Sequence, residues 1–357
     1  ITTINGVDKR EYSKFIYAFA SLFKRQEWYA FGKGPPLVAQ RVADVLSGSL
    51  MATNTDFSRF DGHGSNLMRE VERAALLRAF RPQYHAALIE LHRSQYNLAA
   101  VGAFGTKYEQ GFARASGSPE TSLFNSLVNA FVAFCALRAT MRNGSYLDAD
   151  TAYLSLGIYG GDDGITADVD VTAYKKAASM VGQDITVEPV ARGMLGIKFL
   201  ARVYSPDVWF GDINTCCDLP RTLTKFHTTV AMRSNVTPVM KLLEKTRCLL
   251  LSDRQTPIIG EFCAAVESVY GGEIPYESAA AEASTWLSMS PSQYLNEHAD
   301  WMEAYACNVM PEFNLKQFRS WLARSRDFAS LMKPPMFMPP PAACSKVDVV
   351  VDGEVIS

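Results

Sequence analysis

Two adjacent aspartates, Asp162 and Asp163, follow two glycines directly after the apolar run 153–159. In an extended strand, neighbouring side chains point to opposite faces, so a continuous strand would separate the two carboxylates. A tight turn that contains Gly160 and Gly161 can bring both toward one site, because glycine adopts the backbone angles that such turns need. The sequence therefore predicts a β-hairpin with an acidic tip.

Two carboxylates this close repel each other, and without a partner one of them tends to keep its proton. A divalent cation removes this conflict, because hard cations such as Mg²⁺ bind oxygen ligands. The alternative is purely conformational, since aspartate is common in hairpin turns. The acidic pair needs further motifs before it indicates a metal site.

A second pair of carboxylates lies upstream, where Asp56 and Asp61 are separated by four residues. The preceding residues 49–53 are typical of a short strand, so Asp56 would end the strand and Asp61 would follow the next turn. Both could then face the same cavity. The alternative is that Asp61 or Ser65 caps the amphipathic helix expected at 66–80, a role that is compatible with catalysis.

A third motif has the pattern Ser-Gly-x-x-x-Thr-x-x-x-Asn-Ser, with Ser116, Gly117, Thr121, Asn125 and Ser126 at its fixed positions. Its opening Ser-Gly-Ser-Pro is a turn sequence, and Thr121 begins an apolar helical run that extends to Arg138. Thr121 and Asn125 are four residues apart and lie on one face of that helix. Capping alone could explain these polar groups, but three such motifs in this order are not expected by chance.

The ordered set resembles motifs A, B and C in the palm of viral RNA-dependent RNA polymerases. Within that group, the segments 28–32 and 56–63 are most similar to the nodavirus replicases. The resemblance covers residues 1–230. It implies an α+β right-hand polymerase with fingers, palm and thumb, in which an antiparallel palm sheet is flanked by helices.

The resemblance also implies a division of the chain. The expected parts are fingers at 1–48, palm with motif A at 49–65, a fingers insertion at 66–115, palm at 116–205, thumb at 206–330, and a proline-rich tail or linker at 331–357. Helices are expected at 12–25, 37–46 and 171–181 and in pieces from 218 to 330, and strands at 184–189 and 196–204. The last of these resembles motif E, a hairpin that cradles the primer end.

The implied activity is template-directed nucleotidyl transfer to RNA with two Mg²⁺ or Mn²⁺ ions. Asp56 and Asp162 would be the principal metal ligands, Asp163 a weaker one, and the carbonyl oxygen of Phe57 would complete a coordination position. These residues would bind the reacting groups of the primer and of the nucleoside triphosphate.

The resemblance assigns Asp61, Asn125 and Thr121, or else Ser116 of the Ser116-Gly117 loop, to the ribose of the incoming nucleotide. The 2′-hydroxyl is both a donor and an acceptor. A site built to hydrogen-bond a hydroxyl rejects an analogue that lacks it, because its own polar groups are then left unpaired.

Two departures from the family pattern are apparent. The basic finger motif that normally precedes motif A is not recognisable in residues 1–50, so we expect it upstream of Ile1, in a longer protein. The lysine expected as general acid is replaced at the aligned place by Arg192, which stays protonated and donates a proton poorly. Lys198 is the alternative acid, and if both residues are structural, water would donate the proton.

Composition is ordinary for a globular protein, and the net charge of −2 is not typical of a nucleic-acid binder. A polymerase, however, needs positive charge only along its channel, and the segment 219–254 is rich in lysine and arginine. A solvated helix face would explain this segment equally. The cysteines form no CxxC pair and the histidines no HExxH motif, so zinc is not expected. No apolar segment is expected to be long enough to span a bilayer, and no signal peptide is expected in these residues.

The implied partners are template and product RNA, nucleoside triphosphates and further copies of the chain in a replication complex. Membrane contact would come through regions outside this chain, on the cytosolic face of an organelle in the host cell, which for nodaviruses is the mitochondrial outer membrane. A reverse transcriptase would need bulk near Asp61, and a degenerate palm would lack a metal carboxylate, so neither fits. The remaining alternative is a membrane-associated scaffold that is inactive without its upstream region.

Overall fold

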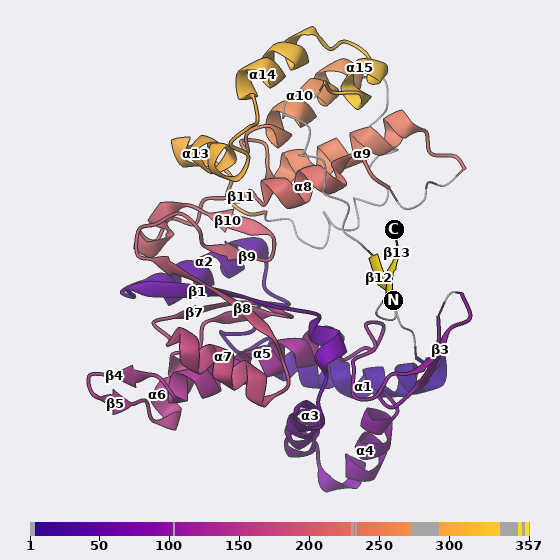
Figure 1. The fold of residues 1–357 in the computed structure, drawn as a ribbon, viewed down its shortest axis with the longest axis vertical. Coiled ribbons are helices and arrows are strands. Elements are labelled where there is room, and N and C mark those ends of the chain that lie inside the picture. Colours follow the sequence, from indigo (N-terminus) through magenta and orange to yellow (C-terminus); the bar gives the residue numbers. More distant parts are fainter. Residues whose placement is uncertain are drawn as a thin grey trace. The chain divides into compact units, whose positions relative to one another are not determined.

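The computed structural model describes residues 4–102, 104–229, 232, 234–272, 293–335, 349–351 and 354–356. The chain forms two compact units, residues 1–215 with 292–295 and residues 216–291 with 296–357, and each is described by itself (Figure 1). The boundary near 215 lies about ten residues beyond the predicted end of the palm. The finer division into fingers, palm and thumb stays a prediction.

The centre of the first unit is a four-stranded sheet with the order β6-β7-β1-β8, in which all neighbours are antiparallel. Its strands are β1 (Met51–Phe57), β6 (Ile158–Gly160), β7 (Asp163–Ala167) and β8 (Ile185–Ala191). The strand predicted at 49–53 therefore begins slightly later and runs one residue beyond Asp56. The predicted strand at 184–189 is confirmed as β8.

Helices cover both faces of this sheet, as predicted (Figure 1). On one face, α5 (Thr121–Arg138) and α7 (Val171–Met180) pack in the apolar cluster that contains Phe57. On the other, α2 (Pro35–Leu46) packs with Ala52 and with the hairpin of β9 (Lys198–Phe199) and β10 (Arg202–Tyr204). Phe57 and Ala52 belong to different faces because side chains alternate along β1.

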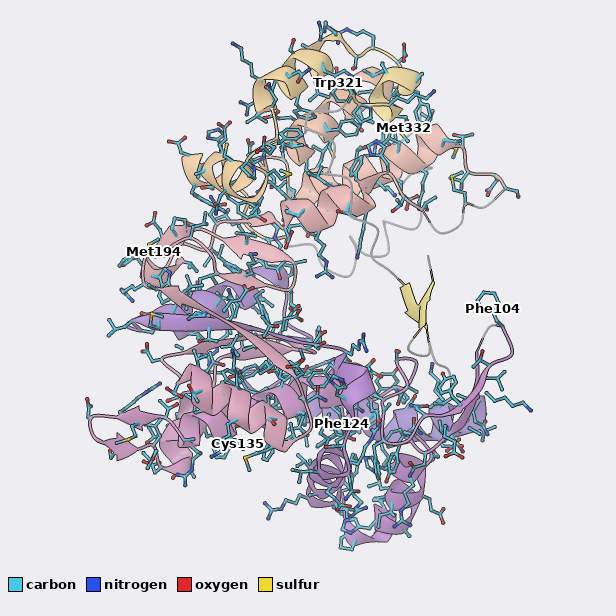
Figure 2. All side chains as sticks on the ribbon, viewed as in Figure 1. Phe104, Phe124, Cys135, Met194, Trp321 and Met332 are labelled. Atoms are coloured by element: carbon cyan, nitrogen blue, oxygen red, sulfur yellow. The ribbon has the colours of Figure 1, made fainter. Side chains whose placement is uncertain are left out.

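Helix α5 is the core helix of the first unit. Among the described residues it is the helix that is long and apolar enough to cross a membrane, and the expectation that no segment has this length is wrong for it. Its Phe124 is fully buried (Figure 2), and 61% of the helix lies inside the protein. Burial in a protein core explains an apolar helix of this kind equally well.

The first unit also contains further α-helices and two hairpins outside this sheet. They are α1 (Gly6–Phe23), α3 (Asn66–Ala79), α4 (His85–Arg93), α6 (Ala149–Leu154), the hairpin of β2 (Ala99–Val101) and β3 (Lys107–Glu109), and the hairpin of β4 (Met141–Arg142) and β5 (Ser145–Tyr146). Ser65 is the N-cap of α3, since its hydroxyl accepts a hydrogen bond from the Met68 amide. Asp61 instead lies in the 3₁₀ turn η1 (Phe60–His63), so capping of α3 does not occupy its carboxylate.

The second unit is helical over most of its described residues. It contains α8 (Leu219–Phe226), α9 (Pro238–Ser252), α10 (Ile259–Tyr270), α13 (Asp300–Val309), α14 (Leu315–Arg324) and α15 (Phe328–Met332), followed by a hairpin of β12 (Val349–Val351) and β13 (Glu354–Ile356). The helical pieces predicted after residue 218 are therefore confirmed. The proline-rich stretch lies outside the described residues from position 336 onward.

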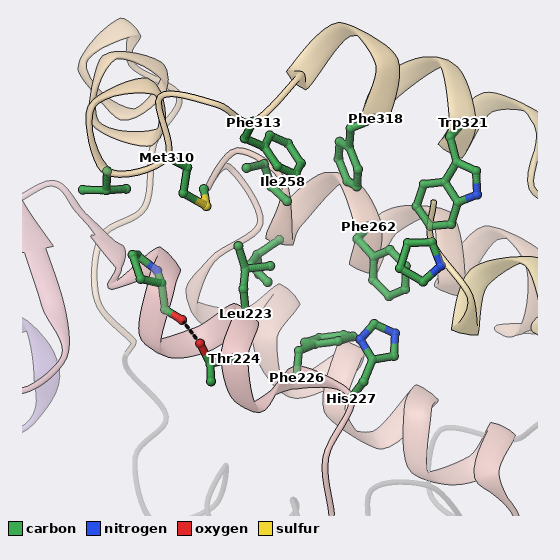
Figure 3. A pocket seen from close by; sticks show the side chains of 14 residues that line it. Leu223, Thr224, Phe226, His227, Ile258, Phe262, Met310, Phe313, Phe318 and Trp321 are labelled. Atoms are coloured by element: carbon green, nitrogen blue, oxygen red, sulfur yellow. Dashed lines mark hydrogen bonds between the residues drawn. The ribbon is translucent and has the colours of Figure 1, made fainter. Parts of the chain in front are cut away.

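A pocket of about 500 Å³ opens between helices of the second unit (Figure 3). Aromatic side chains dominate its lining, among them Phe262, Phe318 and Trp321, and no carboxylate is among the described residues that line it. The dashed contact in the figure is the Thr224 hydroxyl, which donates to the Pro220 carbonyl. Because a hard cation prefers carboxylate oxygens, this apolar pocket does not fit a metal site.

Candidate active site

The acidic hairpin has the predicted form. The last register pair of β6 and β7 is Gly160 with Asp163, which leaves Gly161 and Asp162 as a two-residue turn. Gly161 has a φ of +70°, whereas Asp162 is not among the residues with positive φ, as in a type II′ turn. Asp162 thus lies at the tip and Asp163 begins β7. The apolar run before the hairpin is only partly strand, because its first residues end α6.

The sheet register brings the upstream aspartate to this hairpin. Thr55 pairs with Gly164, so the next position of the same register sets Asp56 opposite Asp163. Directly opposed residues project from the same face, with Cβ atoms roughly 4.5–5.5 Å apart. Asp56 and Asp162 are exposed and Asp163 is half-buried. Carboxylates from two separate motifs therefore lie together where β1 ends and β7 begins. We call this accessible end of the sheet, with Asp56, Asp162 and Asp163, the acidic edge.

The hairpin of β9 and β10 packs against the acidic hairpin. A Cβ atom at Gly160 would lie 3.2 Å from a methyl carbon of Leu200, which shows how close the two hairpins approach. The side chain of Asn54 holds the start of β9. It accepts a hydrogen bond of 3.2 Å from the Lys198 backbone amide and donates one of 2.8 Å to the Gly196 carbonyl. Since Asn54 and Asp56 share a face of β1, Lys198 begins β9 beside that face.

Helix α5 holds the backbone of the acidic turn. The Ser126 hydroxyl accepts a hydrogen bond of 2.8 Å from the Gly161 amide and donates to the Ser122 carbonyl. The side-chain nitrogen Nδ2 of Asn129 donates to the backbone carbonyl oxygens of Gly161, Asp162 and Asp163, each at 3.1 Å. Both side chains are fully buried, so their hydrogen bonds are shielded from water. The turn is therefore positioned by α5.

Two of the predicted ribose-site residues meet directly. The Asn125 amide nitrogen donates to a carboxylate oxygen of Asp61 at 2.9 Å, across 64 positions of sequence. Asn125 Oδ1 accepts from Arg114 Nε at 2.6 Å, and the Arg114 amide donates to the Asp61 carbonyl at 2.7 Å. The predicted pairing of Asp61 with Asn125 is thus present in the structure.

Thr121 and Ser116 have different surroundings. The Thr121 hydroxyl lies 3.1 Å from the carbonyl oxygens of both Ala115 and Ser118, so it fastens the loop before α5 to the helix. Ser116 is exposed in this loop and Gly117 beside it is half-buried. Of the two hydroxyls considered for the ribose, the one on Ser116 is the more accessible.

Arg192 lies at the far end of β8 from the aspartates. Asp56 pairs with Thr186, and Arg192 is six residues further along, roughly 20 Å at the rise of an antiparallel strand. Its guanidinium donates to the carbonyl oxygens of Leu46, Ser49 and Trp209 and lies over the ring of Phe210. This position does not support the expectation that Arg192 reaches a leaving group at the acidic edge.

A second acidic group, away from the acidic hairpin, combines Glu72, His92 and Glu120. Their potential ligand atoms lie within 4.8 Å of one another and all three residues are buried. Two arginines already neutralise the group, because Arg69 and Arg114 each form ion pairs with both glutamates. A cation would have to displace a guanidinium, so this group is a buried ion-pair network.

Burial and neighbouring charge act in opposite directions in this network. Burial alone would raise the pKa of Glu72, but Arg114, His92 and Arg69 outweigh it and lower that pKa to about 2. For Tyr12, burial and the adjacent Glu120 both raise the pKa well above its usual value, and its hydroxyl donates to Glu120 at 2.7 Å. Glu72 is therefore charged and Tyr12 neutral at neutral pH.

From the sequence, no role was predicted for three residues that hold the candidate site in place: Asn129, Arg114 and Ser126, although Ser126 is a fixed position of the third motif. Ser126 and Asn129 are polar residues within an apolar helix, and such residues need hydrogen-bond partners when they are buried. Such a signal predicts that a partner exists but does not identify the acidic turn as that partner. Arg114 carried no such signal, because an arginine two residues before a loop motif is ordinarily exposed.

No protein-family model matches the chain. It is 30% identical over 313 residues to the RNA-directed RNA polymerase of Greasy grouper nervous necrosis virus, which covers 86% of the chain and 31% of that relative. With the enzymes of Atlantic halibut nervous necrosis virus and Flock house virus the identities are 33% over 270 residues and 29% over 267. These cover 75% and 72% of the chain and 27% and 26% of the relatives. The chain thus spans about a quarter to a third of the length of these curated relatives.

Solved structures share the fold. The RNA-dependent RNA polymerase of a human picobirnavirus aligns with a TM-score of 0.59 at 17% identity, over 77% of this chain and 53% of that one. An insertion-loop deletion mutant of the same enzyme aligns with a TM-score of 0.57 at 15% identity, over 78% and 55%. The predicted α+β right-hand polymerase fold is confirmed.

Proposed function

The chain belongs with the nodavirus-like RNA-directed RNA polymerases in sequence and in fold, and on that premise we propose that it extends RNA on an RNA template. The substrates are nucleoside triphosphates and the 3′ end of a growing strand. One observation carries the proposal: the sheet register sets Asp56 opposite Asp163, beside Asp162 at the tip of the same hairpin. Separate segments of the chain thereby build one acidic edge.

The donor set at this edge fits divalent metal. Asp56, Asp162 and Asp163 offer carboxylate oxygens, the ligands that Mg²⁺ and Mn²⁺ prefer, and two of the three are exposed. The backbone carbonyl of Phe57, one residue after Asp56, is a further oxygen donor. Two bound ions would lower the pKa of the primer hydroxyl and neutralise charge on the triphosphate. The protein's own part is to hold the carboxylates in place, through the β1–β7 register and the α5 contacts to the turn.

Ribose recognition is the second part of the proposed function. Asn125 donates to one carboxylate oxygen of Asp61, which leaves the other oxygen to accept from a 2′-hydroxyl. Ser116 is exposed in the loop before α5 and adds a hydroxyl. A deoxyribonucleotide would leave these groups unpaired, which disfavours it.

Lys198 is the better-placed candidate for the general acid. It begins a strand fixed to Asn54, on the face of β1 that carries Asp56, and its side chain is exposed. Arg192 lies at the other end of β8 with its guanidinium engaged by carbonyl oxygens, so we assign it to the support of that end of the sheet. If Lys198 only supports the primer end, water is the donor.

The resemblance extends the proposal to the cellular setting. Template and product RNA are the macromolecular partners, and further copies of the chain would join it in a replication complex. Membrane contact would come through protein outside this sequence, on the cytosolic face of an organelle such as the mitochondrion.

Template-directed synthesis separates this function from that of a polymerase-fold scaffold. Purified protein is given an oligo(U) primer on poly(A) with labelled UTP, and separately with labelled CTP, in Mg²⁺. We expect extension with UTP alone, and only when poly(A) is present. Extension that does not depend on the template would contradict the proposal. So would a lack of extension both by this chain alone and by this chain within a longer protein of the length of its relatives.

A further inference from the structure

Arg114 touches both members of the ribose pair. Its backbone amide donates to the Asp61 carbonyl at 2.7 Å, and its Nε donates to Asn125 Oδ1 at 2.6 Å. Asn125 and Asp61 come from segments 64 positions apart, and Arg114 lies on a third. A single residue therefore connects the two groups that are proposed to read the sugar.

The other two nitrogens of the Arg114 guanidinium are held by buried carboxylates. Nη1 donates to Glu120 at 2.7 Å and Nη2 to Glu72. Each of these three side chains is at most 3% exposed, so water does not compete for the contacts. Because the guanidinium is planar and rigid, fixing Nη1 and Nη2 also fixes the direction of the Nε–H bond.

The direction of that bond determines which way the Asn125 amide faces. Nε–H is a donor only, so it requires the oxygen of the amide rather than its NH₂ group. With Oδ1 held by Arg114, the NH₂ group is left to point at Asp61. The reversed amide would set two donors against each other at Arg114 and two acceptors against each other at Asp61.

We propose that Arg114 is a positioning residue for sugar selection, which holds the Asn125 amide so that Asp61 presents its remaining oxygen to the 2′-hydroxyl. The inference rests on the proposed polymerase function. Arg114 acts through Asn125 and Asp61 and does not contact the sugar itself. Glu72 and Glu120 keep the guanidinium of Arg114 oriented. The buried ion-pair network therefore contributes to sugar selection as well as to the stability of the fold.

Arg69 supplies a matched control. It forms ion pairs with the same two glutamates, at 3.0 Å to Glu72 and 2.8 Å to Glu120, and is equally buried. Its remaining hydrogen bonds go to the carbonyl oxygens of Phe112 and Ala113, and none goes to the ribose pair. Arg69→Lys therefore disturbs the network to a similar extent without releasing Asn125.

The test is the ratio of kcat/KM for UTP to that for dUTP, measured by single-nucleotide extension opposite adenine. A lysine at position 114 keeps the charge but cannot serve three acceptors at the arginine geometry. In Arg114→Lys we expect the ratio to fall roughly five- to tenfold, the effect of one buried hydrogen bond. In Arg69→Lys it should stay within about twofold of wild type. In an Asn125→Ala background, Arg114→Lys should change the ratio no further.

An unchanged ratio in Arg114→Lys, or an equal fall in Arg69→Lys, would overturn the inference. Circular dichroism establishes that each variant is folded. If Arg114→Lys does not fold, Glu120→Gln is measured in its place, because this substitution weakens one of the two carboxylate contacts of Arg114 and leaves Asn125 unchanged. An unchanged UTP-to-dUTP ratio in Glu120→Gln would also overturn the inference. If the wild-type sequence incorporates neither UTP nor dUTP, both as this chain and within a longer protein that includes the upstream region, the polymerase function is refuted and this inference falls with it.

Discussion

The hydroxyl of Ser126 accepts a hydrogen bond of 2.8 Å from the backbone amide of Gly161. This contact joins the helix that carries Asn125 to the turn that carries Asp162. One buried helix thereby positions both the acidic tip and the side chain that we propose reads the sugar, because Asn125 and Ser126 are successive residues of α5. The relative placement of the two proposed subsites is consequently set by the packing of α5.

Removal of the Ser126 hydroxyl should loosen the acidic turn. In Ser126→Ala the Gly161 amide loses its acceptor, so we expect the free energy of unfolding to fall by about 1–3 kcal/mol and nucleotide incorporation to decrease. Urea unfolding and a primer-extension rate measure the two effects. Ser122→Ala on the exposed side of the same helix should stay within about 0.5 kcal/mol of wild type. Equal behaviour of the two variants would show that the contact to Gly161 contributes nothing.

Gly161 should not tolerate a side chain. At a φ of +70° an alanine costs roughly 1–2 kcal/mol of stability, and relief of that strain would move Asp162 at the tip. Gly105, in the open hairpin of β2 and β3, has a φ of +84°, and a Cβ atom there would meet no other atom within 4 Å, so Gly105→Ala bears the same backbone cost elsewhere. We expect both variants to lose stability and only Gly161→Ala to lose incorporation. If Gly161→Ala remains fully active, the geometry of the turn is not critical.

Local patterns and motif order predicted part of this structure, whereas contacts between distant segments could not be predicted from the sequence. Helix α5 begins and ends where its pattern predicted, and the acidic hairpin and the Asp61–Asn125 pair follow from turn chemistry and from motif order. The resemblance placed Thr121 near the ribose, and its position four residues before Asn125 puts both on one face of the helix. Helical spacing predicts which residues share a face, but not that a loop carbonyl binds the threonine first.

The buried network lay beyond prediction for the same reason. Tyr12, Glu72, His92 and Arg114 come from distant segments, and each is of a type that is usually exposed or only partly buried. Only the folded arrangement shows that they neutralise one another. Arg192 is the opposite case. Motif order placed the general acid at this position, but the strand register separates Arg192 from the aspartates.

The buried ion-pair network around Glu72 makes the free energy of unfolding fall at acid pH. The pKa of Glu72 is lowered in the folded protein from 4.5 to about 2, so its stabilising effect is complete above about pH 4.5 and is lost as the pH falls toward 2. We expect a loss on the order of 3 kcal/mol over that interval, measured by urea unfolding at a series of pH values. The exposed Glu90 provides the control, since Glu90→Gln should follow the wild-type profile. If Glu72→Gln loses as much stability between pH 5 and pH 2 as wild type, another group is responsible.

Lys198 and Arg192 should respond differently to substitution. Arg192→Ala leaves the carbonyl oxygens of Leu46, Ser49 and Trp209 without their donor, so we expect a loss of about 1–3 kcal/mol in unfolding free energy and an unchanged pH profile of the chemical step. Lys198→Ala should instead lower the single-turnover rate and flatten that profile at high pH. Rates within twofold of wild type for Lys198→Ala would leave water as the proton donor.

The acidic edge is the central claim, and the effect of Asp162→Asn on labelled UTP incorporation over poly(A) tests it most directly. The substitution keeps the size of the side chain and removes its charge at the tip of the turn. We predict a fall of at least roughly 10²–10³-fold, the effect of removing one electrostatic stabiliser, with the thermal unfolding temperature unchanged or raised. Asp150→Asn, an exposed carboxylate on α6, should retain wild-type incorporation. Incorporation by Asp162→Asn within tenfold of wild type would contradict the account.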